Sequence, residues 1–216
     1  MNKTILIFIA LFFPLLAQAQ DDFESETYFG VKMGGNVSSL LSKPTIKQDL
    51  NNGLIGGMVF KHISQKSLGI QIELNYMQAG WTEKLDGENA YNRQLDYIQL
   101  PFMSHLSLGN KTKFIFNLGP YVSYLLSESE KINLEESTAE KAHYRKEADG
   151  KGDFGLCVGL GMGQHTAIGL FQLEGRISSS LTDVFTSKPI GGFSSSKILN
   201  AEVCLYYLVD LKRKRK

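Results

Sequence analysis

Apolar and polar residues alternate with a period of two along most of the chain after its N-terminal segment. From Leu68 to Tyr76 every second residue is apolar, and the residues between them are glycine or polar. The same alternation returns over Phe154–Met162 and Leu199–Val209. Because successive side chains of a strand point to opposite faces, each stretch predicts a β-strand with one apolar face.

Weaker alternations bring the number of predicted strands to eight. They occupy about residues 28–37, 54–62, 94–106, 113–125 and 167–178. The chain has only five prolines, and it shows little sustained helical periodicity. The pattern therefore predicts an all-β fold.

The connections between these strands fall into two alternating classes. Three are tight, at residues 64–66, 109–110 and 164–165, and four are long and polar, at residues 38–53, 79–93, 126–152 and 179–197. Short turns at one end and long loops at the other, with an even number of strands, are typical of transmembrane barrels. We predict an eight-stranded antiparallel up-and-down transmembrane β-barrel with both chain ends in the periplasm.

The cost of charge in a bilayer predicts which face meets lipid. An ionised side chain at the bilayer centre costs a few kcal/mol, so the apolar face should point outward. We expect the opposite face to fill the lumen as a hydrogen-bonded polar network, because an eight-stranded barrel is just wide enough for its side chains to fill. The predicted network consists of Lys32, Gln71, Glu73, Asn75, Glu174, Arg176 and Glu202, with Gln99, Asn117, Gln172 and Asn200 on the same face.

Aromatic residues near the ends of the predicted strands are expected to form girdles at the two membrane interfaces. They are Tyr28, Tyr76, Trp81, Tyr97, Tyr124, Tyr206 and Tyr207. One alternative inverts the two faces and gives a soluble, lipocalin-like carrier with an apolar lumen. The pattern alone leaves that alternative open.

The N-terminus reads as a secretory signal peptide. Lys3 precedes an apolar run from Ile5 to Leu16, and Ala17-Gln18-Ala19 forms a small-residue cleavage site. The apolar run is too short for a membrane anchor. We predict a cleaved signal peptide at residues 1–19, a barrel domain at residues 20–211 and a basic tail at residues 212–216, with export to the outer membrane.

Charge and cysteine content narrow the possible partners. The chain has 23 Lys and Arg against 22 Asp and Glu, and five of the basic residues form the run from Lys212 to Lys216. The rest of the mature chain is acidic on balance, which argues against a nucleic-acid partner. The two cysteines, Cys157 and Cys204, fall in strands two apart in the predicted sheet, too far for a disulfide, so we predict free thiols.

The sequence contains no recognisable catalytic or metal-binding pattern. The four histidines lie far apart without zinc-site spacing, and we expect them at the surface or in turns. Ser104 and His105 are adjacent, so in a strand they face opposite sides and cannot form a nucleophile–base pair. We predict no metal, no cofactor and no enzymatic activity; an outer-membrane enzyme is the least favoured alternative.

Several short motifs, in this order, resemble the PorT-like outer-membrane β-barrel proteins of the Bacteroidetes. They are Gly30-Val31-Lys32-Met33-Gly34-Gly35-Asn36, the segment from Glu73 to Gly80, Tyr97-Ile98-Gln99-Leu100-Pro101, Leu118-Gly119-Pro120-Tyr121 and Asp153-Phe154-Gly155-Leu156. The resemblance covers essentially the whole mature chain and implies an eight-stranded outer-membrane barrel without shared catalytic residues. One departure is that the chain continues beyond Tyr206-Tyr207 to Lys216, whereas bacterial barrels often end on an aromatic residue.

This resemblance, together with the pattern of faces and loops, leads to a functional expectation. We expect a non-enzymatic barrel with a structural, adhesive or secretion-accessory role performed through its external loops, with a filled lumen that is not a general pore. Its expected partners are outer-membrane lipid and other envelope or secretion proteins.

Overall fold

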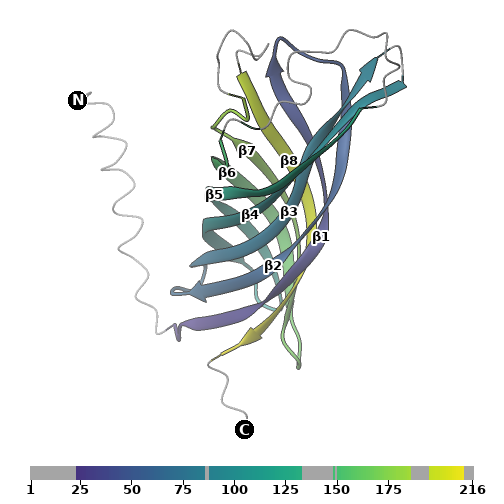
Figure 1. The fold of residues 1–216 in the computed structure, drawn as a ribbon. Helices are drawn as coiled ribbons and strands as arrows, with labels where there is room; N and C mark the ends of the chain where they lie inside the picture. The colour runs from purple at the N-terminus through teal and green to yellow at the C-terminus, as the bar shows by residue number, and fades with distance from the viewer. Residues whose placement is uncertain (1–22, 86–87, 133–147, 149, 186–194, 212–216) are drawn as a thin grey trace, which may run out of the picture.

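A computed structural model describes residues 23–85, 88–132, 148, 150–185 and 195–211, which form eight strands closed into a barrel (Figure 1). The strands are β1 (Glu26–Lys43), β2 (Gln48–Ile63), β3 (Leu68–Leu85), β4 (Glu88–Leu108), β5 (Thr112–Ile132), β6 (Gly152–His165), β7 (Leu170–Ser180) and β8 (Ser195–Asp210). Each pairs antiparallel with its neighbours in chain order, and β1 pairs with β8. The predicted eight-stranded up-and-down barrel is confirmed. The described residues contain no helix that is long and apolar enough to cross a membrane.

The strands are strongly tilted against the barrel axis. Paired residues can be followed from Thr27 on β1 through Ile70 on β3, Leu118 on β5 and Ile177 on β7, and the path returns to β1 at Val37 rather than at Thr27. Such a stagger is what closing a sheet into a barrel requires. Closure pairs both edges of every strand and leaves no open sheet edge in the wall.

Two of the four predicted long loops are wrong, because most of residues 38–53 and 79–93 continue the strands. β1 and β2 are joined by residues 44–47, and β3 and β4 by residues 86–87. Beyond the bilayer a strand still needs its backbone hydrogen bonds, but it no longer needs an apolar face. The alternation of apolar and polar residues in the sequence therefore ends before the strand does. At this end the Gln48 side chain also bonds to the backbone N–H and C=O of Leu40.

The turns at the opposite end are short, as predicted, and join the strands at residues 64–67, 109–111 and 166–169. The third turn lies later than the predicted Gln164-His165, which belongs to the end of β6. Thr166 closes this turn by donating from its backbone N–H and its hydroxyl to the Gly169 carbonyl. Gly169 has a φ of 152°, and a Cβ there would lie 2.7 Å from the Leu208 carbonyl oxygen, so the position requires glycine.

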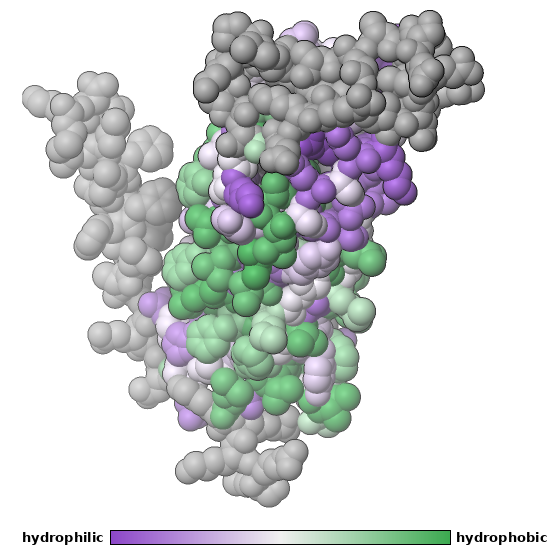
Figure 2. Space-filling view, in the orientation of Figure 1, coloured by the Kyte–Doolittle hydropathy of each residue, from purple (hydrophilic) through white to green (hydrophobic). Residues whose placement is uncertain are grey.

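The two faces of the sheet differ as predicted. Large apolar side chains from all eight strands remain exposed on the outside, with exposed fractions such as 71% for Met33 and 66% for Leu160. Figure 2 shows this apolar surface in green over the flank of the barrel, with hydrophilic residues gathered toward the end at which β3 and β4 reach furthest. Each polar or charged residue predicted for the lumen is buried. The outside is therefore the lipid-facing side.

The predicted aromatic girdles are partly wrong. Tyr76 and Tyr124 lie on the outer face, with Tyr207 half-buried, but Tyr28, Trp81, Tyr97 and Tyr206 point into the barrel. The inward set follows the strand parity of the polar lumen residues, as Tyr206 shares a face with Cys204 and Glu202. Their rings fill the interior rather than the membrane interface.

The cysteines are confirmed as free thiols: Cys157 on β6 and Cys204 on β8 are both buried, with β7 between their strands. The predicted signal peptide and basic tail fall on residues 1–22 and 212–216, which lie outside the described part of the chain. They and the domain boundaries remain predictions.

Charging the outer face should destabilise the barrel. Leu118 on β5 is 49% exposed, and Leu118→Arg should lower the free energy of unfolding by about 2–4 kcal/mol, because the arginine would lie in hydrocarbon. Urea titration of the barrel in lipid vesicles, followed by the fluorescence of the single tryptophan Trp81, measures the change. Ser129→Arg, on the exposed outer part of the same strand, should change stability by less than about 1 kcal/mol. Equal losses in the two variants would contradict the assignment of the lipid face.

Candidate functional site

The centre of the lumen holds a charge-balanced network of three basic and three acidic side chains. Its members are Lys32, Lys61, Arg176, Glu73, Glu174 and Glu202, each at most 5% exposed. They come from five strands, β1, β2, β3, β7 and β8. Because buried charges are tolerated only when they are paired and hydrogen-bonded, this balance is a condition for placing them inside the barrel.

Arg176 and Lys32 bind the same carboxylates. Arg176 makes two parallel bonds of 2.8 Å to the two oxygens of Glu73, and its Nη2 also donates to Glu174 at 2.8 Å. Lys32 Nζ lies 3.0 Å from Glu73 and 2.8 Å from Glu202. Glu73 is therefore shared by two cations, and it joins β1, β3 and β7 across the lumen.

Amide side chains extend the network along both walls. Gln71 and Asn75 donate to the two oxygens of Glu73 at 2.6 and 2.9 Å. Asn117 and Gln172 donate to Glu174 at 2.8 and 2.7 Å. These bonds hold the carboxylates in place, and charge-assisted hydrogen bonds of this kind are the stronger ones.

Lys61 is attached at the edge of the network. Its ammonium group donates to the side-chain oxygen of Gln172, which in turn donates to Glu174. The buried imidazole of His105 bonds to Asn117 with 2.7 Å between Nδ1 and Oδ1. Lys61 is thus connected to the Glu174 carboxylate through the side-chain amide of Gln172.

Small residues on the inner face of β6 make room for the network. A Cβ on Gly159 would lie 2.2 Å from a carboxylate oxygen of Glu174, and one on Gly155 would lie 2.4 Å from the ring of Tyr121. Between them Cys157 donates to the carbonyl of Gly119. Large inward side chains of the two neighbouring strands, β5 and β7, therefore lie directly against the β6 backbone.

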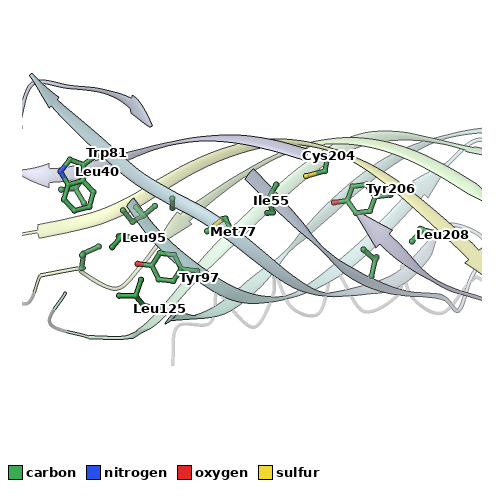
Figure 3. Close-up of a cluster of buried hydrophobic side chains, with 14 of the residues drawn as sticks. Leu40, Ile55, Met77, Trp81, Leu95, Tyr97, Leu125, Cys204, Tyr206 and Leu208 are labelled. Atoms are coloured by element: carbon green, nitrogen blue, oxygen red, sulfur yellow. The ribbon is translucent and has the colours of Figure 1, made fainter. Parts of the chain in front are cut away.

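Apolar side chains line the lumen on both sides of the polar layer. Toward the outer end the buried set contains Leu40, Met77, Trp81, Leu95, Tyr97, Leu125 and Ile198, and toward the turns it contains Tyr28, Ile63, Leu170 and Leu208. Figure 3 shows these side chains spread along the barrel, from Leu40 and Trp81 at one end to Tyr206 and Leu208 toward the other. Side chains therefore fill the interior along its length, and apolar layers lie on both sides of the polar layer.

A cation–aromatic cluster closes the outer mouth. The guanidinium of Arg93 lies 5.2 and 5.8 Å from the ring centroids of Phe185 and Trp81, and these two rings meet edge to face with 6.2 Å between their centroids. It also bonds to Glu128 and to the hydroxyl of Tyr91, and burial raises the pKa of that phenol. Phe185 belongs to the β7–β8 connection, and its backbone N–H donates to Ser196 at 2.8 Å. The connection thus places an aromatic side chain over the lumen.

All seven residues of the predicted network are brought together, but sequence reasoning missed several neighbours. Lys61, His105 and Tyr206 are buried beside them, and Arg93 is buried in the separate cluster with Trp81 and Phe185. Their inward position follows from strand parity, since Lys61 shares the inner face of β2 with Val59 and His105 shares the inner face of β4 with Met103. The expectation that the histidines lie at the surface is wrong for His105, which is 1% exposed, while His143 lies outside the described residues.

Among the described residues neither a metal-holding cluster nor the adjacent Ser104–His105 pair forms a site. No group of three His, Cys, Asp or Glu side chains that could hold a metal occurs among them. Ser104 lies on the exposed face of β4, whereas His105 is buried in the lumen. The network consists of basic and acidic side chains that neutralise one another.

A family model for the outer membrane protein beta-barrel domain matches residues 17–186. The chain belongs to this family. Its location is therefore the outer membrane, and the apolar face described above contacts the lipid of that membrane. No curated protein is similar enough in sequence to match the chain.

Solved structures with the same fold are distant in sequence. The outer membrane protein OprG from Pseudomonas aeruginosa is 10% identical, with a TM-score of 0.50 over 85% of this chain and 93% of that one. Neisserial surface protein A is 9% identical, with a TM-score of 0.46 over 86% and 99%. Ail, the attachment invasion locus protein of Yersinia pestis, is 10% identical, with a TM-score of 0.43 over 85% and 99%. At these identities the likeness concerns the fold alone.

Breaking the network at Arg176 should be costly. Arg176→Gln leaves Glu73 and Glu174 with one cation fewer, and we expect the free energy of unfolding in lipid vesicles to fall by about 3–5 kcal/mol. The matched control is Lys84→Gln, which removes the exposed Lys84–Asp49 pair and should cost less than about 1 kcal/mol. Similar losses in the two variants would show that the lumen charges do not act as a buried network.

The glycine row of β6 gives a second test. Gly159→Ala forces the Glu174 carboxylate out of its bonds with Arg176, Gln172 and Asn117, and should lower the free energy of unfolding by about 1–3 kcal/mol. Gly175→Ala on β7 is the control, because its Cβ would point into open space with the nearest atom 3.9 Å away. An equally large loss for Gly175→Ala would contradict this account.

Proposed function

We propose that this outer-membrane barrel is a non-enzymatic protein whose lumen is closed and whose function lies at its outer end. The observation that carries the proposal is the filled interior. Arg176, Glu73 and Lys32 bridge the middle of the lumen, and Arg93, Trp81 and Phe185 cover its outer mouth. A solute would have to displace both layers to cross.

The outer end offers a surface for interaction with other molecules. The β3–β4 hairpin and the end of β5 project beyond the lipid-facing apolar surface, and their outward side chains are polar, among them Asn92, Gln94, Asp96, Ser127 and Ser129. Hydrogen bonds such as Ser127 to Asp96, 2.9 Å, tie this surface across β4 and β5. A rigid, polar, projecting sheet suits contact with a macromolecule better than chemistry on a small substrate.

Within this role we propose a structural, adhesive or secretion-accessory activity of the PorT-like type. The support is the ordered set of motifs from Gly30 to Leu156, together with the polar sheet that projects from the outer end. The partners would be outer-membrane lipid and other envelope proteins. The proposed layout remains a signal peptide at 1–19, a barrel at 20–211 and a basic tail at 212–216.

The alternatives are less well supported. A soluble lipocalin-like carrier needs an apolar lumen and a polar outside, which is the reverse of the observed arrangement. An outer-membrane enzyme needs a catalytic cluster in an open site, and the described residues contain no group of His, Cys, Asp or Glu side chains that could hold a catalytic metal. We do not propose either activity.

A closed lumen predicts no general permeability. Liposomes containing the wild-type barrel should swell in sugar or amino-acid solutions no faster than empty liposomes, since the eight-stranded lumen is occupied by side chains. A Phe185→Ala, Arg176→Ala double variant, folded as judged by heat-modifiable gel migration, is the positive comparison. Rapid swelling with the wild-type protein would overturn the closed-lumen proposal.

The place of interaction can be mapped by photo-crosslinking in native outer membranes. A photoreactive residue at Ser129 should give protein adducts, because this position lies on the projecting polar sheet. The matched position Leu118, on the lipid-facing part of the same strand, should give none. Adducts only from a probe at Lys66, in the β2–β3 turn, would move the function to the periplasmic end instead.

A further inference from the structure

Two tyrosines mark the outer limit of the apolar face on β3, β4 and β5. Tyr76 of β3 pairs with Ile98 of β4, and Ile98 pairs with Tyr124 of β5, so the three outward side chains lie side by side. Their exposed fractions are 44%, 37% and 51%. Tyrosine is enriched where the hydrocarbon meets the head groups, because its ring is apolar and its hydroxyl is polar. This row therefore marks the boundary between hydrocarbon and head groups on this side of the barrel.

A row of polar side chains follows outside the tyrosines. The next paired outward residues are Gln78, Asp96 and Ser127, and Leu126 stands exposed in a bulge of β5 between the two rows. Two residues of strand span roughly 7 Å, so the polar row lies at the level of the lipid head groups. Figure 2 shows hydrophilic residues bordering the apolar flank toward the end of β3 and β4. Because these side chains point away from the lumen, they face the lipids around the barrel.

Hydrogen bonds hold this polar row in place. Asp96 accepts bonds from the Gln94 amide and the Ser127 hydroxyl, both at 2.9 Å. The side-chain oxygen of Gln78 accepts a bond of 3.2 Å from the backbone N–H of Leu54. A carboxylate has about four acceptor positions, and the bonds from Gln94 and Ser127 use one on each oxygen of Asp96. Asp96 is therefore a fixed acceptor for hydroxyl groups that approach from the lipid side.

The charge of this row favours one class of head group. Asp96 is the only ionised residue of the row, and Lys84 and Lys131 lie at least two rows further out. Lys84 is also paired with Asp49 at 2.7 Å. A phosphate beside Asp96 would be repelled by the carboxylate. A neutral head group rich in hydroxyls would instead donate hydrogen bonds to it, and bonds to a charged acceptor are the stronger ones.

A saccharide fits both the polar row and the tyrosines beneath it. Its hydroxyls can donate to Asp96 and exchange hydrogen bonds with the amide of Gln78. Its C–H groups can pack on the ring of Tyr76 or Tyr124, because the face of an aromatic ring carries partial negative charge.

We infer that the row of Gln78, Asp96 and Ser127, with Tyr76 and Tyr124 beside it, binds the saccharide head group of a lipid in the outer leaflet. The inference rests on the outer-membrane location and on the continuity of this row with the lipid-facing surface. It does not require the proposed protein partners, which are tested at Ser129, one row further out.

Native mass spectrometry of the full-length barrel released from mixed-lipid nanodiscs tests this site. The probes are digalactosyldiacylglycerol, phosphatidylglycerol and phosphatidylcholine with identical acyl chains. The wild-type protein should retain the digalactosyl lipid in preference to both phospholipids. Asp96→Ala should reduce that preference about tenfold, the loss expected for one hydrogen bond to a charged acceptor. Asp210→Ala, at the opposite end of the barrel, is the matched control and should leave the preference unchanged.

Removing an aromatic ring tests the second part of the site. Tyr76→Leu keeps an apolar side chain toward the lipid, and it should reduce the preference roughly three- to tenfold, the effect of one aromatic contact. Tyr207→Leu, on the outer face of β8 toward the turns, is the control and should behave as wild type. If Asp96→Ala fails to show heat-modifiable migration, Asp96→Asn takes its place, because the amide keeps the shape of the side chain and loses its charge.

Three results would overturn the inference. The first is equal retention of the digalactosyl lipid and phosphatidylcholine by the wild-type protein. The second is a preference for phosphatidylglycerol, which would indicate a site for an anionic head group. The third is an unchanged preference in folded Asp96→Ala or Tyr76→Leu. None of these results depends on whether a protein binds at Ser129, so this inference and the proposed function can fail separately.

Discussion

The absence of water from the bilayer core is the constraint on which this structure depends. Lipid offers no partner to a backbone N–H or C=O group, so the wall must be a closed ladder in which each strand pairs on both edges. Lipid also offers no polar partner to a charged side chain, so every ionised side chain within the membrane must point into the lumen. The pairing of β1 with β8 satisfies the first demand, and the Arg176–Glu73–Lys32 bridge satisfies the second.

Charged side chains that point into the lumen are buried, and they therefore need partners of opposite charge. Three carboxylates are matched by three basic groups, and the amides of Gln71, Asn75, Asn117 and Gln172 complete the bonding. The lumen has space for these side chains because β6 presents glycine and cysteine to them. The same packing that satisfies the charges also blocks the passage. Stability and closure therefore have one cause, which is why we propose that the activity lies on surfaces outside the lumen.

The barrel is unequal at its two ends. The turns near the chain ends are short, and one is fixed by Gly169, whereas β3, β4 and β5 continue past the membrane and carry a polar outer face. The outer mouth is covered by Phe185 stacked on Arg93. We propose that the partners of the protein are molecules outside the barrel.

The sequence by itself determined the number of strands, their alternation and the face that each residue occupies. Period-two patterning is a local property, so Glu73, Arg176 and Glu202 could be placed in the lumen without coordinates. It did not determine where strands end outside the membrane, because β3 and β4 continue there without an apolar face. Nor did it show that Lys61 joins the network through Gln172, or that Arg93 of β4 meets Phe185 of the β7–β8 connection. Those facts depend on the stagger that brings strands distant in sequence to the same height, and only the closed barrel decides that stagger.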